Sequence, residues 1–461
     1  MSILGAFMVP HPPLIIPAVG KGSEEQIRET IDAYDEAARQ IAALRPDTII
    51  ISSPHSVLYA DYFHISPGRA ANGSFERFGA PQVEFHETYD DELVTRIEKL
   101  CDQKRFPAGT LGERESKLDH GTMVPLYFIR KYFNDFKLVR LGLSGLDLTR
   151  HYELGTIINE AVEQLDRRVV YVASGDLSHK LQTYGPYGFA KEGPVYDERI
   201  MDVCSRGDFE ELFGFDETFC EKAAECGHRS FVIMAGVLDG KALEIKKLSH
   251  QDVTGVGYGI CTFRPVGDDE GRHFLRSYMK KKMSEVYGKA DSSDAYVRLA
   301  RATVEAYTVN RSVPEIPKDL PKEMTERAAG AFVSIHEHGR LRGCIGTFLP
   351  TTDCIAQEII QNAVSASTRD PRFDPIEPEE LPFLEINVDI LSEPEDIASE
   401  DELDVKRYGV IVRSGNRRGL LLPDLDGVDT VGQQIDIARR KGGIGEHEPV
   451  TLQRFEVVRH Y

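Results

Sequence analysis

The stretch FMVPHPPLIIP, Phe7 to Pro17, ends an apolar run on a histidine that two prolines follow. Two more apolar runs close in the same way: DTIIISSPHS (Asp47–Ser56) contains His55, and RRVVYVASGDLSH (Arg167–His179) ends on a histidine. In an open α/β sheet, ligands bind beyond the carboxyl ends of the parallel strands. We therefore expect these strand-terminal histidines to meet in one crevice.

Strand-like and helix-like segments alternate through the first half of the chain. KLVRLGLSG (Lys137–Gly145) is a further β-rich apolar run, and EEQIRETIDAYDEAARQIAAL (Glu24–Leu44) places its apolar residues on one helical stripe. Such alternation is typical of an α/β domain, so we predict a central, largely buried sheet flanked by helices.

A composition break divides the chain, which at 461 residues is too long for one ordinary core. FRPVGDDEGRHF (Phe263–Phe274) collects proline, glycine and acidic residues, and a polar stretch follows it. We predict a first domain over 1–266, a linker over 267–290 and a second domain over 291–461. In the second domain we expect a helix with Ser293 as its N-cap and two hairpins, at Gly330–Phe348 and around Gly415, which together indicate an α+β fold.

Bulk composition excludes several classes of protein. Hydrophobic residues make up 41% and charged residues 28%, as in soluble globular proteins, and the net charge of −20 disfavours nucleic acid and anionic membrane surfaces as partners. No apolar run approaches the ~20 residues of a membrane span, and the first residues lack the basic region of a signal peptide. Seven cysteines, an odd number without a CxxC pair, favour reduced thiols and a cytoplasmic location.

Further residues with metal-binding or proton-transfer chemistry lie close to these motifs. His120 stands in LDHGTMVPL, and Glu225 and Cys226 are adjacent in AAECGHRSF. Two neutral imidazoles and a carboxylate suit Fe(II) with open positions, and the same set could hold zinc. Further histidines could move protons.

Asp119 and Asp176 are candidates for orienting these side chains. The alternative interpretation is structural. A strand-end histidine is often only a polar cap, and a cysteine such as Cys226 is often a small buried hydrophobe.

The motifs MVPHPP, SSPHS, LDHGTMVPL and SGDLSH, in this order over about Met1–Val266, resemble the LigB-type class III extradiol dioxygenases and the related Memo-like proteins. The resemblance implies that His11 and His55 bind non-haem Fe(II), with Glu225 as the third ligand. It further implies that His179 is the acid/base histidine and that His120 contacts substrate or dioxygen.

In Memo-like proteins a cysteine of a Cys-Gly motif takes the third ligand position, and Cys226 is also followed by glycine. We favour Glu225, because a carboxylate suits a ferrous ion better than a thiolate does. The implied reaction is oxidative ring opening of a catechol-like substrate. The alternatives are a non-enzymatic, Memo-like metal-binding or adaptor protein, and a zinc- or iron-dependent hydrolase that uses the same cleft.

The second half resembles the AMMECR family over about Leu299–Tyr461, through LRGCIGTF, NAVSASTRDPRF and LPFLEINVDILSEPE. This resemblance implies an α+β fold. A fusion of the two families is similar to components of the AmmeMemoRadiSam system. The implied partner is a separate radical-SAM protein, because this chain has no CxxxCxxC cluster for an iron–sulfur centre.

One cysteine of the second half, Cys344, follows Arg342 closely, and we expect His336 and His338 on the partner strand. It is either a nucleophile activated by the nearby cation or a small residue that fills space between glycines. In TRDPRF, Arg369 and Arg372 either clamp an anion or are solvated beside a turn.

Overall fold

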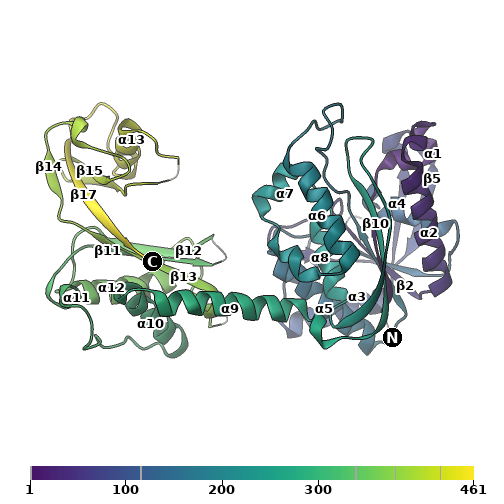
Figure 1. The fold of residues 1–461 in the computed structure, drawn as a ribbon, viewed down its shortest axis with the longest axis horizontal. Coiled ribbons are helices and arrows are strands. Elements are labelled where there is room, and N and C mark those ends of the chain that lie inside the picture. Colours follow the sequence, from purple (N-terminus) through teal and green to yellow (C-terminus); the bar gives the residue numbers. More distant parts are fainter. Residues whose placement is uncertain (1–2, 115–116, 338–339, 379, 426) are drawn as a thin grey trace. The chain divides into compact units, whose positions relative to one another are not determined.

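In the computed structural model, which describes residues 3–114, 117–337, 340–378, 380–425 and 427–461, the chain forms two compact units. The units are Met1–Tyr278 and Met279–Tyr461, and the boundary between them falls within helix α9 (Phe274–Ser292) (Figure 1). This helix occupies most of the segment predicted as a linker. Its first residues belong to the first unit, because Phe274, Leu275 and Tyr278 pack against the core of that unit.

The first unit is built on a six-stranded sheet in the order β7-β2-β8-β1-β10-β9. The first four strands of this order run parallel, whereas β10 is antiparallel to β1 and to β9. Their bounds are β1 (Ile3–Val9), β2 (Thr48–Ser53), β7 (Lys137–Gly142), β8 (Val169–Ser174), β9 (Lys241–Gln251) and β10 (Tyr258–Asp268). Every residue of β2 and β8 is buried, which explains why these strands read as continuous apolar runs.

Helices cover both faces of this sheet (Figure 1). Alternate residues of the strands face opposite layers, so that Met8 and Ile50 belong to one core cluster and Phe7 and Ile49 to the other. One layer contains α3 (Asp91–Gln103), α5 (Leu148–Gln164), α6 (Glu192–Arg206) and α8 (His228–Val237), and the other contains α2 (Arg28–Leu44) and α4 (His120–Arg130). The predicted α/β fold is confirmed.

Short elements complete the first unit. They are η1 (Pro13–Ile15), α1 (Pro17–Gly20), η2 (Ser23–Ile27), β3 (Phe63–His64), β4 (Ala70–Phe75), η3 (Glu76–Phe78), β5 (Ala80–Thr88), β6 (Ala108–Gly109), η4 (Phe209–Gly214), α7 (Glu217–Ala223) and η5 (Glu270–Arg272). The helix expected over Glu24–Leu44 begins as the 3₁₀ turn η2 and becomes α-helical at Arg28.

The second unit is an antiparallel, seven-stranded sheet with helices packed on it, which confirms the predicted α+β fold. The strands are β11 (Ala331–Glu337), β12 (Arg340–Thr347), β13 (Leu384–Leu391), β14 (Glu395–Ile397), β15 (Tyr408–Ser414), β16 (Arg417–Leu421) and β17 (Thr451–His460). The helices are α10 (Ala295–Asn310), α11 (Lys322–Glu326), α12 (Ile355–Thr368), α13 (Val431–Lys441), η6 (Leu381–Phe383) and η7 (Glu400–Glu402). Both predicted hairpins are present, as β11–β12 and β15–β16.

Two smaller observations concern the helices. The predicted N-cap Ser293 is wrong by one residue, because the carboxylate of Asp294 accepts the amide hydrogens of Tyr296 and Val297 at the start of α10. Among the described residues, no helix combines the length and the apolar composition that crossing a membrane requires.

Candidate metal centre

The candidate site lies where three neighbouring parallel strands end. Strands β2, β8 and β1 are adjacent in the sheet, and Val9 at the end of β1 pairs with Ser174 at the end of β8. The carboxyl ends of these three strands therefore lie side by side. The structure brings His11 and His55 together there, with 3.0 Å between their Nε2 atoms.

The hydrogen bonds of His11 fix which ring nitrogen faces the site. Ser174 Oγ donates to the carbonyl oxygen of Gly121 at 2.6 Å, so it accepts the hydrogen of His11 Nδ1 at 2.9 Å. Nε2 of His11 then carries a lone pair directed toward His55. Burial, followed by the neighbouring His55 ring, lowers the pKa of His11 well below its ordinary value, which keeps the ring neutral.

His55 is exposed and lies two residues beyond β2. Its backbone N–H donates to Ser53 Oγ at 3.2 Å, and Ser53 Oγ donates to Asp119 Oδ1 at 2.6 Å. Asp119 is also the N-cap of α4, where it accepts the amide hydrogen of Thr122. Asp119 therefore positions the backbone near His55 and His120. It does not orient either imidazole ring directly.

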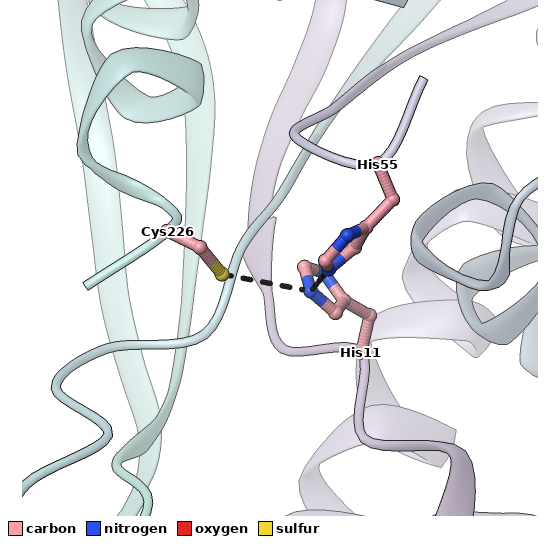
Figure 2. A group of neighbouring side chains, drawn as sticks. All are labelled: His11, His55 and Cys226. Atoms are coloured by element: carbon pink, nitrogen blue, oxygen red, sulfur yellow. Dashed lines mark hydrogen bonds between the residues drawn. The ribbon is translucent and has the colours of Figure 1, made fainter. Parts of the chain in front are cut away.

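Cys226 supplies the third side chain. Its Sγ lies 3.6 Å from His11 Nε2, and the candidate ligand atoms of His11, His55 and Cys226 all lie within 4.8 Å of one another. Figure 2 shows the three side chains pointing toward one another. Burial, followed by the carboxylates of Asp176 and Glu225, raises the pKa of the Cys226 thiol well above its ordinary value.

Two glycines bring the Cys226 loop to the end of β8. A Cβ atom added to Gly175 would lie 2.1 Å from Cα of Gly227, so the two backbones are in direct contact. The amide hydrogen of Gly227 also bonds to the carbonyl oxygen of Asp176 at 3.1 Å. Close backbone packing therefore holds the Cys226 loop against the end of β8, and Asp176 links both partners to it, because its carboxylate accepts the amide hydrogen of His11 at 2.7 Å and its own amide donates to Cys226 Sγ at 3.3 Å.

Glu225, favoured above as the third ligand, is not part of this group. Its carboxylate accepts the amide hydrogen of His228 at 2.6 Å, at the start of α8, and the hydroxyl of Tyr196 at 3.5 Å. Burial raises the pKa of Glu225 to about 7. The free amides at a helix N-terminus attract a carboxylate, and this attraction directs Glu225 away from the two imidazoles while Cys226 faces them.

His120 and His179 flank the group without being part of it. The His120 ring lies 4.0 Å from the His55 ring and 5.4 Å from the His11 ring, measured between centroids. Burial and these two rings lower the pKa of His120 to about 4. Nδ1 of His179 donates to the carbonyl oxygen of Ala224 at 2.5 Å, which leaves its Nε2 as the basic nitrogen, 4.0 Å from Asp176 Oδ2.

A cavity of about 840 Å³ adjoins the site. His55 and His120 line it on the side of the metal-binding group, and Phe78, whose ring contacts that of His120, lines it together with Asn72 and Glu84 of the β4–β5 hairpin. A space of this size beside two imidazoles is large enough to admit an organic substrate.

Sequence reasoning missed the residues that support the ligands. Ser174 orients His11, and Gly175 permits the approach of the Cys226 loop. A polar residue and a glycine at the end of an otherwise apolar strand were visible in VVYVASGD. Their partners lie 50 or more residues away along the chain, so the sequence could not show which contacts they make.

In the second unit, the motif around Cys344 has a structural explanation. Asp370 accepts the Cys344 amide hydrogen at 2.9 Å, and Arg372 bonds both to Asp370 and to the Cys344 carbonyl oxygen. β12 is an edge strand, so this pair satisfies backbone groups that a neighbouring strand would otherwise bind. Arg372 is therefore engaged within the fold and does not stand free as an anion clamp. Of the predicted neighbours of Cys344, His338 lies outside the described residues.

Comparison with known proteins places both units in families. Residues 5–261 match the family described as the catalytic LigB subunit of aromatic ring-opening dioxygenase. The chain belongs to the LigB family. Residues 297–460 match the AMMECR1 family, so this LigB-family chain is a fusion of the two domains. Dioxygenases of the LigB family typically depend on a non-haem metal, and the His/Cys group is a possible metal site here.

Some relatives match the whole chain, and others match only one of its two units. A protein of Clostridium acetobutylicum is 39% identical over 468 residues, covering all of this chain and 99% of its own length. A protein of Thermotoga maritima is 50% identical over 167 residues, which cover 36% of this chain and 96% of the relative. A crystal structure of a Pyrococcus horikoshii protein has 29% identity and a TM-score of 0.33, and covers 36% of this chain and 88% of that chain.

Proposed function

We propose that the LigB unit is a metal-dependent enzyme of the extradiol type, with Fe(II) as its metal and a catechol-like aromatic diol as its substrate. The observation that carries this proposal is the convergence of His11, His55 and Cys226, whose candidate ligand atoms lie within 4.8 Å of one another. Two further histidines and a cavity of about 840 Å³ adjoin the group.

The donor set fits a divalent transition metal. Imidazole suits iron and zinc, and a thiolate also binds both. His11 would bind through Nε2, because Ser174 holds its Nδ1 hydrogen, and Cys226 would bind as the thiolate, because a bound cation favours thiol ionisation. When bound, such a metal acts as a Lewis acid and as a template for diol and dioxygen.

His179 would act as the proton acceptor. Its Nδ1 hydrogen bonds to Ala224, so Nε2 is free to take the proton of a substrate hydroxyl and to return it later. The carboxylate of Asp176, 4.0 Å from that nitrogen, would stabilise the imidazolium. His120 is neutral because its pKa is about 4, and it would donate a hydrogen bond to substrate or dioxygen.

Oxygen uptake by protein loaded with iron under anaerobic conditions tests this function. We expect uptake when catechol is added, and a loss of about 10²- to 10⁴-fold in kcat for His179→Gln, as for removal of a general base. His447→Gln, an exposed histidine of the second unit, is the matched control. Uptake that is unaffected by His179→Gln would contradict the proposed role of His179.

A second candidate is a metal-binding protein without catalysis, such as a Memo-like adaptor. The presence of a thiol in place of a carboxylate in the group favours it, because thiolates suit zinc as well as iron. Protein that retains zinc, binds no catechol when loaded with iron and consumes no oxygen would support this candidate over the enzyme.

We further propose that the fused protein works with a separate radical-SAM protein. The fusion of LigB and AMMECR1 domains supports this, because each domain is similar to a component of the AmmeMemoRadiSam system, whose third component is a radical-SAM protein. Co-purification of the full chain with the radical-SAM protein of the same organism tests it, and the absence of any complex at micromolar concentrations of both proteins would count against it.

A further inference from the structure

Two arginines of the second unit lie directly opposite each other on neighbouring strands. Arg413 of β15 pairs with Arg418 of β16, and both side chains are exposed. Directly paired residues of an antiparallel ladder point to the same face of the sheet, where like charges destabilise the pair. Among the described residues, neither guanidinium group has an acidic partner. The fold therefore retains an unrelieved concentration of positive charge at this position.

The neighbouring arginine, Arg417, faces the opposite side of the same hairpin. Alternate residues of a strand point to opposite faces, and Arg417 lies on the face where α13 packs. There its guanidinium group donates to the carboxylate of Glu448 at 3.2 Å. Arg417 is therefore neutralised within the fold, whereas Arg413 and Arg418 are not.

A hydroxyl group extends this row by one strand. Thr451 of β17 pairs with Arg413 on the side away from Arg418, and its side chain is also exposed. The Thr451–Arg413–Arg418 row thus presents a hydroxyl and two guanidinium groups on one face of the sheet. Because neighbouring strands lie only about 4.8 Å apart, the two long arginine side chains can converge on one small anion beside the hydroxyl.

An aromatic ring holds one of the two guanidinium groups in place. The guanidinium carbon of Arg418 lies 4.2 Å from the centre of the Phe348 ring. Phe348 in turn packs against the small core cluster that contains Ile411 and Phe455. A guanidinium group that stacks on an aromatic ring keeps the N–H groups at its edge available for hydrogen bonds. Arg418 therefore loses less freedom when it binds an anion.

The number and the charge of these groups indicate which anion they suit. A carboxylate has two oxygens and one negative charge, which a single arginine satisfies in a bidentate pair. A phosphate monoester has three terminal oxygens and a charge of about −1.5 to −2 at pH 7, which matches two arginines and a hydroxyl. Nucleic acid is a poor match, because the net charge of −20 on the chain repels a polyanion.

We propose that the Thr451–Arg413–Arg418 row binds the phosphoryl group of a phosphate monoester. Each arginine would donate hydrogen bonds to phosphoryl oxygens, and the anion would relieve the repulsion between the two guanidinium groups. The Thr451 hydroxyl would donate to the third oxygen. The row belongs to the second unit, so this proposal does not depend on the function proposed for the LigB unit. The phosphoryl group can belong to a small molecule or to a phosphorylated side chain.

Isothermal titration of the full chain at constant ionic strength tests the site. The probes are phenyl phosphate, a blocked alanyl-phosphoseryl-alanine peptide and, as a carboxylate, benzoate. We expect both phosphates to bind at least roughly tenfold more tightly than benzoate. Tighter binding of phenyl phosphate would indicate a small-molecule ligand, and tighter binding of the peptide a phosphorylated protein. Failure of both phosphates to bind, or affinities equal to that of benzoate, would overturn the proposal.

Variants distinguish this row from the general charge of the hairpin. Arg413→Gln and Arg418→Gln should each weaken the binding of phenyl phosphate by roughly tenfold or more. Arg417→Gln is the matched control, because it removes the same charge from the opposite face of the hairpin, and the affinity should stay nearly unchanged. Equal losses in Arg417→Gln and Arg418→Gln would show that charge alone attracts the anion and would refute the site.

Thermal unfolding of the second unit adds a measurement that begins without a ligand. In the absence of phosphate, Arg413→Gln should raise the Tm, because the substitution removes the repulsion across the two strands. Added phenyl phosphate should then raise the Tm of the wild type but not that of the variant. If the anion raised both Tm values equally, Arg413 would not bind it. A folded transition in each variant verifies that weaker binding does not reflect unfolding.

Discussion

A single hydroxyl determines how His11 can serve the site. Ser174 Oγ gives its hydrogen to Gly121 and receives the one on His11 Nδ1, so the opposite ring nitrogen is left to bind a cation. Metal-binding histidines usually have such a partner on the second nitrogen. The sequence predicted His11 and His55, because each ends an apolar run, but it did not reveal Ser174 as the residue that sets the tautomer.

Replacing Ser174 should weaken metal binding without unfolding the unit. For Ser174→Ala we expect roughly 10- to 100-fold lower metal affinity, as for other partners of ligand histidines, measured by competition with a chelator. Ser52→Ala is the matched control, because Ser52 is a buried serine on the neighbouring strand β2 and bonds to Ser230 instead. Equal affinities of the two variants would contradict the role of Ser174.

The second unit offers a prediction about pH. The Arg372 guanidinium, followed by the Cys344 amide, holds the pKa of Asp370 well below its usual range. A pKa that is lower in the folded state than in the unfolded chain adds stability above about pH 4, and this stability is lost as the pH falls further. Between pH 6 and pH 3, thermal unfolding should therefore show a smaller loss of Tm in Asp370→Asn than in the wild type.

The control for this prediction is Asp374→Asn, which removes an exposed carboxylate nearby. Its Tm should follow that of the wild type at every pH. If the Tm of the wild type fell with pH in parallel with that of Asp370→Asn, the Asp370–Arg372 pair would not contribute to stability.

At the scale of elements, the order of the strands explains why His11 and His55 lie close together. The carboxyl ends of β1, β2 and β8 meet because these strands are parallel neighbours, and the pattern of apolar runs ending in histidine was sufficient to infer this. The choice between Glu225 and Cys226 was not predictable. The two residues are adjacent, and the start of α8 decides which of them faces the histidines.

The contact between the loop after β8 and the Cys226 loop can be tested by a substitution. In Gly175→Ala the new methyl group would overlap Gly227 and displace the Cys226 loop from the end of β8. We expect about 1–3 kcal/mol lower free energy of unfolding and weaker metal binding. Gly267→Ala, where a Cβ atom meets nothing within 4 Å, should change neither quantity. Full metal affinity in Gly175→Ala would show that the loop position is not critical.

At the scale of the whole molecule, the two units have separate hydrophobic cores. The candidate metal centre lies entirely within the first unit. A ligand that binds only the folded state stabilises it by about 2.7 kcal/mol at a concentration 100 times its Kd. Calorimetry of the full chain should therefore show two unfolding transitions. Added metal should raise the Tm of only one of them, the transition of the first unit.

The variant Cys226→Ala provides the comparison for this experiment. Both unfolding transitions should remain in this variant. Added metal should no longer raise the Tm of the transition that belongs to the first unit. If the wild type unfolded in a single transition whose Tm rose with metal, the two units would unfold as one, and the division into separately stable cores would be incorrect.

The most direct test of the account is metal content after anaerobic purification with iron supplied. We predict about one metal ion per chain in the wild type and in Glu225→Gln, and loss of that ion in His11→Ala, His55→Ala and Cys226→Ala. Retention of stoichiometric metal by Cys226→Ala together with its loss in Glu225→Gln would contradict the proposed centre, as would a wild-type protein that binds no metal.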